Sequence, residues 1–209
     1  MDLYHGSNNI IDKPKHDGSR DRTDFGRGFY LTPNENQARR WSIKGIRKVV
    51  NCYKLNIDEL KVYKFELGLE WLLFIILNRK VGDFKFEALK ERFKFLGDVD
   101  IIIGPTADDR MYNTLEEFFD GDISLEKTLD ILNCMELSDQ YLIKTKEGIN
   151  KLQHMSSYEI EGELFDDVVS DDKNFMSSIK QKVRLYQRKI YENEKYIEDI
   201  QEVINNVTK

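Results

Sequence analysis

The stretch FGRGFYLT, Phe25–Thr32, is expected to decide the fold of this chain. Two glycines, Gly26 and Gly28, lead into a short run of aromatic and β-forming residues that predicts a strand. A second short strand, LYHGS at Leu3–Ser7, precedes it and carries His5, one of only three histidines. Taken alone, His5 is best interpreted as a polar residue at the end of a strand, so its meaning depends on the rest of the chain.

A helix is expected directly after the FYLT strand. TPNENQARRWS offers Thr32 as a helix N-cap and Glu35 as the second half of a capping box, which predicts a helix to about Arg47. Two stretches rich in β-forming residues, 48–56 and 60–66, flank a tight turn and predict a meander.

Helices and strands then follow at irregular spacing. The apolar run LEWLLFIIL predicts a buried helix, and it is shorter than the roughly 20 residues that span a bilayer. The elements expected beyond it are a helix from Phe84 to about Phe95, a buried strand at 98–105, a helix at 106–119, a helix from Ser124, and a last strand at Gln140–Thr145. Because regular βαβ repeats are absent from the sequence, we expect an α+β fold rather than a doubly wound sheet.

Composition limits the possible functions. The 209 residues fit one domain, or one domain with an appendage, and 40% are hydrophobic, which is enough for a core. The net charge of −6 provides no overall basic field to attract nucleic acid. Cys52 and Cys134 are isolated, so neither a disulfide framework nor a metal site is expected. No signal segment is recognisable and no membrane association is expected, so the cytoplasm is the expected location.

The composition changes near residue 155, which predicts a globular domain over 1–155. Residues 156–172 are expected to form an acidic linker, because YEIEGELFDDVVSDD carries seven acids and no basic residue. Residues 173–209 show a heptad pattern that predicts one long helix of roughly 45–50 Å. The apolar seam and its one polar member are Met176, Ile179, Val183, Tyr186, Ile190, Asn193, Ile197, Ile200 and Ile204.

The charges along this tail are divided. Lys173–Lys189 holds six basic residues and no acid, whereas Glu192–Glu202 holds five acids and one lysine. Antiparallel pairing would match these charges, either in a homodimer or against a partner helix. The alternative is that the helix packs on its own domain.

Taken together, LYHGS and FGRGFYLT resemble the histidine–tyrosine, poly(ADP-ribose) polymerase-like branch of the ADP-ribosyltransferase superfamily. The chain is also similar, over roughly residues 2–153, to a bacterial family, the domain of unknown function numbered 3990. That similarity rests on the blocks DFGRGFYLTPNENQARRW, IIIGPTADDRMY and DQYLIKT. It implies a split antiparallel β-sheet with surrounding helices, the long C-terminal helix lying outside the resemblance.

The resemblance implies that NAD is the co-substrate and assigns residues to it. His5 is expected to hydrogen-bond a ribose hydroxyl of the adenosine half. The backbone of Gly6 can approach the nicotinamide amide closely, because glycine has no side chain. Ser7 can add a hydroxyl to the same amide or to a ribose. Tyr30 is expected to stack on the nicotinamide ring.

Further residues are expected around the pyrophosphate. Gly26 and Gly28 allow the chain to turn tightly beside the dinucleotide, and Arg27 can neutralise its phosphates. Arg110 either binds phosphate or pairs with the acids beside it. No metal is expected.

A third position departs from the superfamily's pattern. Many members carry a glutamate on a late strand, where this chain has Gln140. Glutamine can orient a ribose hydroxyl by hydrogen bonding but cannot act as a general base. Asp108 and Asp109 are candidate bases, with Asp109 the preferred one, although capping of the following helix explains both without catalysis.

The expected function is therefore a mono-ADP-ribosyltransferase, a glycosyltransferase that cleaves NAD and modifies a macromolecule. The resemblance suits a bacterial toxin of a toxin–antitoxin or phage-defence system, with an antitoxin or a second copy bound through residues 173–209. The acceptor is a protein or a nucleic acid, and the acidic composition slightly favours protein. One alternative is a non-catalytic NAD-binding module that acts through its coiled coil, and another is NAD hydrolysis.

Overall fold

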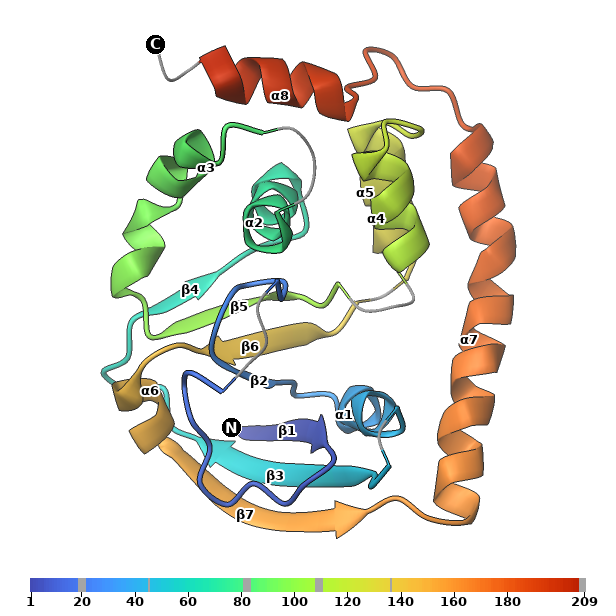
Figure 1. Cartoon of the computed structure of the whole chain (residues 1–209). Helices are drawn as coiled ribbons and strands as arrows, with labels where there is room; N and C mark the ends of the chain where they lie inside the picture. Colours follow the sequence, from blue (N-terminus) through green and yellow to red (C-terminus); the bar gives the residue numbers. More distant parts are fainter. Residues whose placement is uncertain (19–21, 45, 81–83, 108–110, 136, 207–209) are drawn as a thin grey trace.

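The computed structural model describes residues 1–206 apart from 19–21, 45, 81–83, 108–110 and 136, and its strands form two sheets (Figure 1). The three-stranded sheet is antiparallel, in the order β1 (Asp2–Ser7), β3 (Val49–Leu55), β7 (Leu152–Glu159). The four-stranded sheet has the order β2 (Phe29–Leu31), β6 (Asp139–Ile143), β5 (Ile101–Pro105), β4 (Val62–Lys64), with only its β4–β5 pair parallel. The α+β class expected from the sequence is confirmed.

The two sheets meet at one isolated bridge within the described chain. The backbone N–H of Tyr4 donates to the Thr32 carbonyl at 2.8 Å, and the Thr32 N–H donates to the Tyr4 carbonyl at 2.9 Å. Beyond this pair β1 continues with β3, whereas β2 continues with β6. The sheets therefore separate at the ends of the two strands that carry the sequence motifs.

Most of the helices cover one face of the four-stranded sheet (Figure 1). They are α2 (Leu69–Arg79), α3 (Phe86–Arg92), the 3₁₀ turn Lys94–Asp98, α4 (Tyr112–Phe119) and α5 (Leu125–Asn133). The helix predicted from LEWLLFIIL is confirmed as α2, in which residues 71–76 are all buried. Helix α1 (Glu35–Ser42) packs against β1, and α6 (Lys146–Asn150) precedes β7. None of the described helices is both long and apolar enough to cross a membrane.

Three apolar clusters hold these layers together. The largest joins the helices to the four-stranded sheet, with Trp71 and Phe118 fully buried in it. The second lies between the sheets and contains Leu3, Phe29 and Tyr53. The third is small and lies between α1, the three-stranded sheet and the start of α7.

The C-terminal tail differs from the single helix expected over 173–209. It forms α7 (Glu163–Arg188), which begins inside the predicted acidic linker, and α8 (Ile197–Asn206). The chain leaves the helix after Arg188, and Asn193 in the connection has a left-handed φ of 58°. Figure 1 shows α7 running along one side of the molecule and α8 lying across the helical layer.

The tail packs on its own domain, the alternative left open by its sequence. Four seam residues are buried in the largest cluster, namely Ile179, Ile197, Ile200 and Ile204. By contrast Ile190, also a seam position, is 90% exposed in the connection between the helices. The connection is fastened to α5 by the bond from Leu125 N–H to the Lys195 carbonyl (2.7 Å) and by the Lys127–Glu194 ion pair (3.0 Å).

Three local predictions are wrong. The predicted meander is absent, because β3 and β4 belong to different sheets. The strand at Gln140–Thr145 is not the last one, since β7 follows it. The N-cap of α1 is Asn34 rather than Thr32, its side chain accepting the Gln37 N–H at 3.2 Å, and this helix ends at Ser42.

Candidate functional site

The open edge of β1, where the sheets separate, directs unpaired peptide groups toward β2. Tyr4 directs its N–H and C=O to Thr32. Alternate residues of a strand direct these groups to the same edge, so Gly6 presents its N–H and C=O on the Tyr4 side. Tyr30 lies two residues before Thr32 and faces this position, yet no backbone bond joins it to Gly6. One N–H and one C=O are therefore available between the strands.

The absence of a side chain at Gly6 is required by α1. A Cβ at this position would lie 2.0 Å from the Ala38 carbonyl oxygen and 2.8 Å from the Ser42 nitrogen. Both are backbone atoms of a packed helix, which cannot move aside cheaply. The structure thus adds a packing reason for this glycine to the ligand-binding reason predicted from the sequence.

His5 links β1 to β2 at the point where the two sheets separate. Its Nδ1 lies 2.6 Å from the Tyr30 carbonyl oxygen, and its ring packs on Phe29 with centroids 4.5 Å apart. A carbonyl only accepts, so Nδ1 carries the proton and Nε2 is an acceptor in the neutral ring. Burial lowers the pKa of His5, which favours this neutral form. Nothing in the described chain hydrogen-bonds to Nε2.

Tyr30 is fixed by its hydroxyl within the loop before β2. The hydroxyl donates to the Gly26 carbonyl at 2.7 Å, accepts the Phe25 N–H at 3.0 Å and lies 3.0 Å from Thr23 Oγ1. Burial raises the pKa of this phenol, so the hydroxyl stays protonated. Gly26 has a φ of +88°, which favours glycine at this turn. Tyr30 is therefore held rigidly, and its ring packs on the helical side of the sheet.

Asp24 is a site residue that sequence reasoning missed. Its Oδ2 accepts from Gln140 Nε2 at 2.8 Å and from the Ala107 N–H at 3.2 Å. Its Oδ1 accepts from Arg79 Nε at 2.9 Å and also from a second Arg79 nitrogen, so that two nitrogens of the guanidinium bind the same oxygen. Asp24 is the first residue of the block DFGRGFYLTPNENQARRW, and its place in that block is the sequence signal that could have identified it.

The polar residues of the two motifs thus form one connected group. His5 contacts Tyr30, the Tyr30 hydroxyl contacts the loop at Thr23, and the next residue, Asp24, contacts Gln140. Gln140 is 3% exposed and lies at the start of β6, beside the bridge. Hydrogen bonds and the chain between Thr23 and Asp24 thus link three of the predicted site residues, His5, Tyr30 and Gln140, and the structure adds Asp24 with Arg79.

The other predicted residues lie around this group. Ser7 Oγ donates to the Asn9 carbonyl at 2.6 Å, closing the loop after β1. Gly28 packs against β6, where a Cβ would lie 2.3 Å from Leu142 Cδ1. Arg27 is exposed on the turn between the two glycines. Asp108, Asp109 and Arg110 lie outside the described residues.

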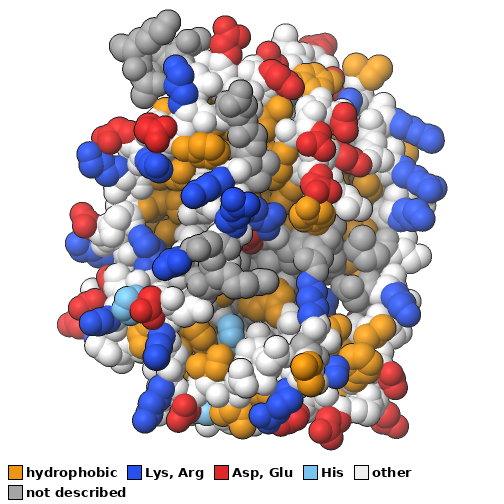
Figure 2. All heavy atoms as spheres, viewed as in Figure 1, with side chains coloured by type: hydrophobic (Ala, Val, Ile, Leu, Met, Phe, Trp, Pro, Cys, Tyr) orange, Lys and Arg blue, Asp and Glu red, His pale blue; other side chains and the backbone are white. Residues whose placement is uncertain are grey.

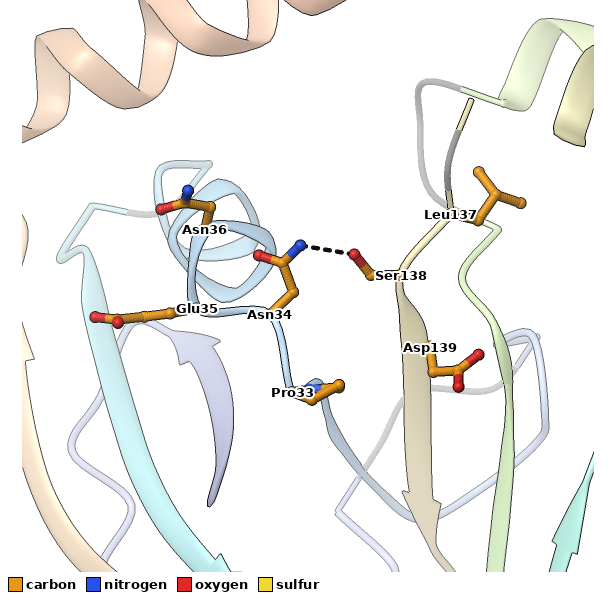
Figure 3. A pocket seen from close by; sticks show the side chains of 7 residues that line it. All are labelled: Pro33, Asn34, Glu35, Asn36, Leu137, Ser138 and Asp139. Atoms are coloured by element: carbon orange, nitrogen blue, oxygen red, sulfur yellow. Dashed lines mark hydrogen bonds between the residues drawn. The ribbon is translucent and has the colours of Figure 1, made fainter. Parts of the chain in front are cut away.

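Figure 2 shows one face of the molecule, on which Lys and Arg side chains alternate with acidic and apolar ones and a histidine is visible near the middle. An open cavity of about 620 Å³ lies between the start of α1 and the start of β6. There Asn34 Nδ2 donates to Ser138 Oγ at 2.7 Å (Figure 3). This cavity borders Asp139, next to Gln140, but the predicted site residues do not line it.

Metal binding has no evident site in the part of the chain that the structure describes, since no three His, Cys, Asp or Glu residues gather there. Fold and site define an α+β protein whose two sheets separate beside a group of polar residues linked by hydrogen bonds and by the chain. The chain belongs to the family described as "Protein of unknown function (DUF3990)", which matches residues 1–154. No curated protein and no solved structure matches it.

Proposed function

We propose that this protein is a mono-ADP-ribosyltransferase that cleaves NAD and transfers ADP-ribose to a macromolecule. The observation that carries the proposal is the open edge of β1, where Gly6 presents one N–H and one C=O toward Tyr30. A carboxamide has one acceptor and two donors, so the nicotinamide amide complements these two peptide groups. The bridge register places Gly6 opposite Tyr30, whose ring is suited to stack on the nicotinamide.

The rest of NAD is proposed to contact His5, Arg27 and Ser7. His5 Nε2 is an acceptor without a partner among the described residues, which suits a ribose hydroxyl of the adenosine half. Arg27, exposed beside the site, is proposed to neutralise the pyrophosphate, and Ser7 to add a hydroxyl. The role of Arg110 at a phosphate and that of Asp109 as a base remain predictions on residues outside the described chain.

The proposed reaction breaks the bond between the nicotinamide nitrogen and C1′ of its ribose. The bonding electrons return to the pyridinium ring, so nicotinamide leaves uncharged while positive charge develops on the ribose. The acceptor's oxygen or nitrogen then bonds to C1′ and loses its proton to a base or to water. The chain's residues bind and orient NAD, and holding the nicotinamide rigidly favours this charge separation.

Nicotinamide release from NAD tests the proposal. The full chain is incubated with NAD and a cell extract as acceptor source, and nicotinamide is quantified by chromatography. We expect release by the wild type and its loss in His5→Ala, with His154→Ala as the matched control. His154 lies on β7, two strands away from β1, and bonds Ser157. Equal release by the wild type and His5→Ala, or none by either, contradicts the proposal.

A toxin acting in the cytoplasm is the proposed biological role. Expression of the wild type is then expected to arrest growth of the host cell, and His5→Ala to relieve the arrest. Much of the apolar seam proposed to bind an antitoxin packs against the chain's own domain, where Ile179, Ile197 and Ile200 are buried.

NAD binding without turnover would instead favour a non-catalytic NAD-binding module.

A further inference from the structure

The carboxamide of Gln140 lies between groups that can only accept hydrogen bonds. Its Nε2 is 2.8 Å from Asp24 Oδ2 and 3.4 Å from the Pro105 carbonyl oxygen. A carboxylate and a carbonyl have no proton to give, so both require the NH₂ end of the amide. The orientation of an amide is assigned from such partners, and here both partners agree.

This orientation leaves the other end of the amide unused. Oε1 of Gln140 receives no hydrogen bond from the described residues, and this atom keeps some contact with solvent although the residue as a whole is only 3% exposed. An acceptor left without a donor in such a place is costly unless water or a ligand supplies one. Gln140 thus offers a hydrogen-bond acceptor at the start of β6, the strand that pairs with β2.

Asp24 is held firmly enough to impose this orientation. Arg79, at the end of α2, binds Oδ1 with two nitrogens, and its guanidinium also donates to the Ala107 carbonyl at 2.7 Å. The Ala107 N–H donates to Oδ2 at 3.2 Å. The Asp24 side chain is 13% exposed. Arg79 thus holds Oδ1 while the Ala107 N–H holds Oδ2, and donors on both oxygens fix the direction as well as the position of the carboxylate.

We infer that Asp24 is a positioning residue that turns Gln140 so that its Oε1 accepts a hydroxyl of the nicotinamide ribose. This inference rests on the proposed function. Asp24 binds the NH₂ end, and the exposed end then offers the same acceptor as a carboxylate oxygen, without its charge. Gln140 binds the hydroxyl in this arrangement and removes no proton.

The orientation itself can be tested without NAD. In ¹⁵N-labelled protein the side-chain amide signals of Gln140 are identified by their absence in Gln140→Glu. We expect nuclear Overhauser contacts between these amide protons and the Ala107 N–H, because both donate to Asp24 Oδ2. In Asp24→Asn the new side chain can donate as well as accept, so the signals should shift and the contacts weaken. Unchanged signals in Asp24→Asn would overturn the inference.

The function of this orientation is tested by exchanging the two side chains. Gln140→Glu sets two carboxylates against each other, and we expect NAD affinity to fall about tenfold or more. In Asp24→Asn/Gln140→Glu the asparagine NH₂ donates to the new carboxylate, which frees its other oxygen for the ribose. We therefore expect the double variant to bind and cleave NAD better than either single variant.

Calorimetry measures NAD affinity, chromatography measures nicotinamide release, and thermal melting confirms that each variant is folded. Asp139→Asn is the matched control, because this acid precedes Gln140 but pairs with Lys64 instead (3.0 Å) and should keep wild-type affinity. A double variant no better than Gln140→Glu alone overturns the inference. A wild type that neither binds nor cleaves NAD defeats the proposed function, and the amide signals still decide the orientation of Gln140.

Discussion

The open edge of β1 leaves polar groups without a partner, whereas the C-terminal helices α7 and α8 bury apolar side chains against the rest of the chain. At the edge, the Gly6 peptide groups and His5 Nε2 have no hydrogen-bond partner among the described residues. In the tail, Ile197 and Ile200 are 2% and 5% exposed against the helical core. One region presents polar groups that have no partner in the described chain, whereas the other buries isoleucine side chains against its own domain.

The difference shows which kind of signal indicates a ligand. An apolar period predicts that a helix face will be buried, but it does not say against what. A polar group left without a partner in a partly buried place indicates a missing ligand or water, because leaving it so costs free energy. The four predictions below test this contrast, from the largest expected effect to the smallest.

Ile200→Ala should give the largest effect if the tail is part of the core. Removing a buried isoleucine side chain typically lowers the free energy of unfolding by about 2–5 kcal/mol. Val203→Ala is the control, since this residue of the same helix is 62% exposed and should change stability by less than about 0.5 kcal/mol. Chemical denaturation measures both. Equal effects would mean that α8 does not dock as described.

Gly6→Ala should affect both stability and NAD binding. The new methyl group meets backbone atoms of α1, and overpacking of this kind typically costs about 1–3 kcal/mol. The displaced strand should also lose NAD-induced thermal stabilisation. Gly97→Ala, where a Cβ meets nothing within 4 Å, is the control and should keep both properties. A Gly6→Ala variant with wild-type stability would contradict the packing of α1 on β1.

His5 should make stability depend on pH. Burial lowers its pKa in the folded state, so below about pH 6.5 the unfolded chain binds more protons than the folded one. Stability should then fall as the pH falls, by at most about 1.4 kcal/mol per pH unit from this one group. Denaturation of the wild type and His5→Gln between pH 5 and 8 measures the difference. Parallel curves would show that His5 is not buried in the neutral form.

The Lys127–Glu194 pair should give the smallest effect. It joins α5 to the connection between α7 and α8 at 3.0 Å, with 16% and 18% of the two side chains exposed. A double-mutant cycle of Lys127→Met and Glu194→Gln should give a coupling of about 0.2–1 kcal/mol, as is typical of pairs near the surface. A coupling as large as the loss in Ile200→Ala would mean that polar contacts, not burial, hold the tail.

The elements that could be predicted are those whose signals are local. Helix α2 and strand β5 are continuous apolar runs, and burial on every side follows from that composition alone. The meander was wrong because a β-rich stretch does not name its partner, and β4 pairs with β5 instead. Strand β7 was missed because LQHMSSYE is half polar and lies at the edge of its sheet.

The site shows the same limit. His5, Gly6 and Tyr30 could be predicted because two short motifs carry them. Asp24 acquires its role only through Arg79 and Gln140, which lie 55 and 116 residues away in the sequence. Such a long-range contact leaves no local pattern, so its part in the site became evident only from the structure.

The most direct test of the central claim is the response of the Gly6 backbone amide to NAD. In ¹⁵N-labelled full chain titrated with NAD, and separately with nicotinamide, the Gly6 signal should shift and its hydrogen exchange should slow. Gly97, remote from the site, should not respond. A Gly6 signal that stays unchanged at saturating NAD would contradict the account.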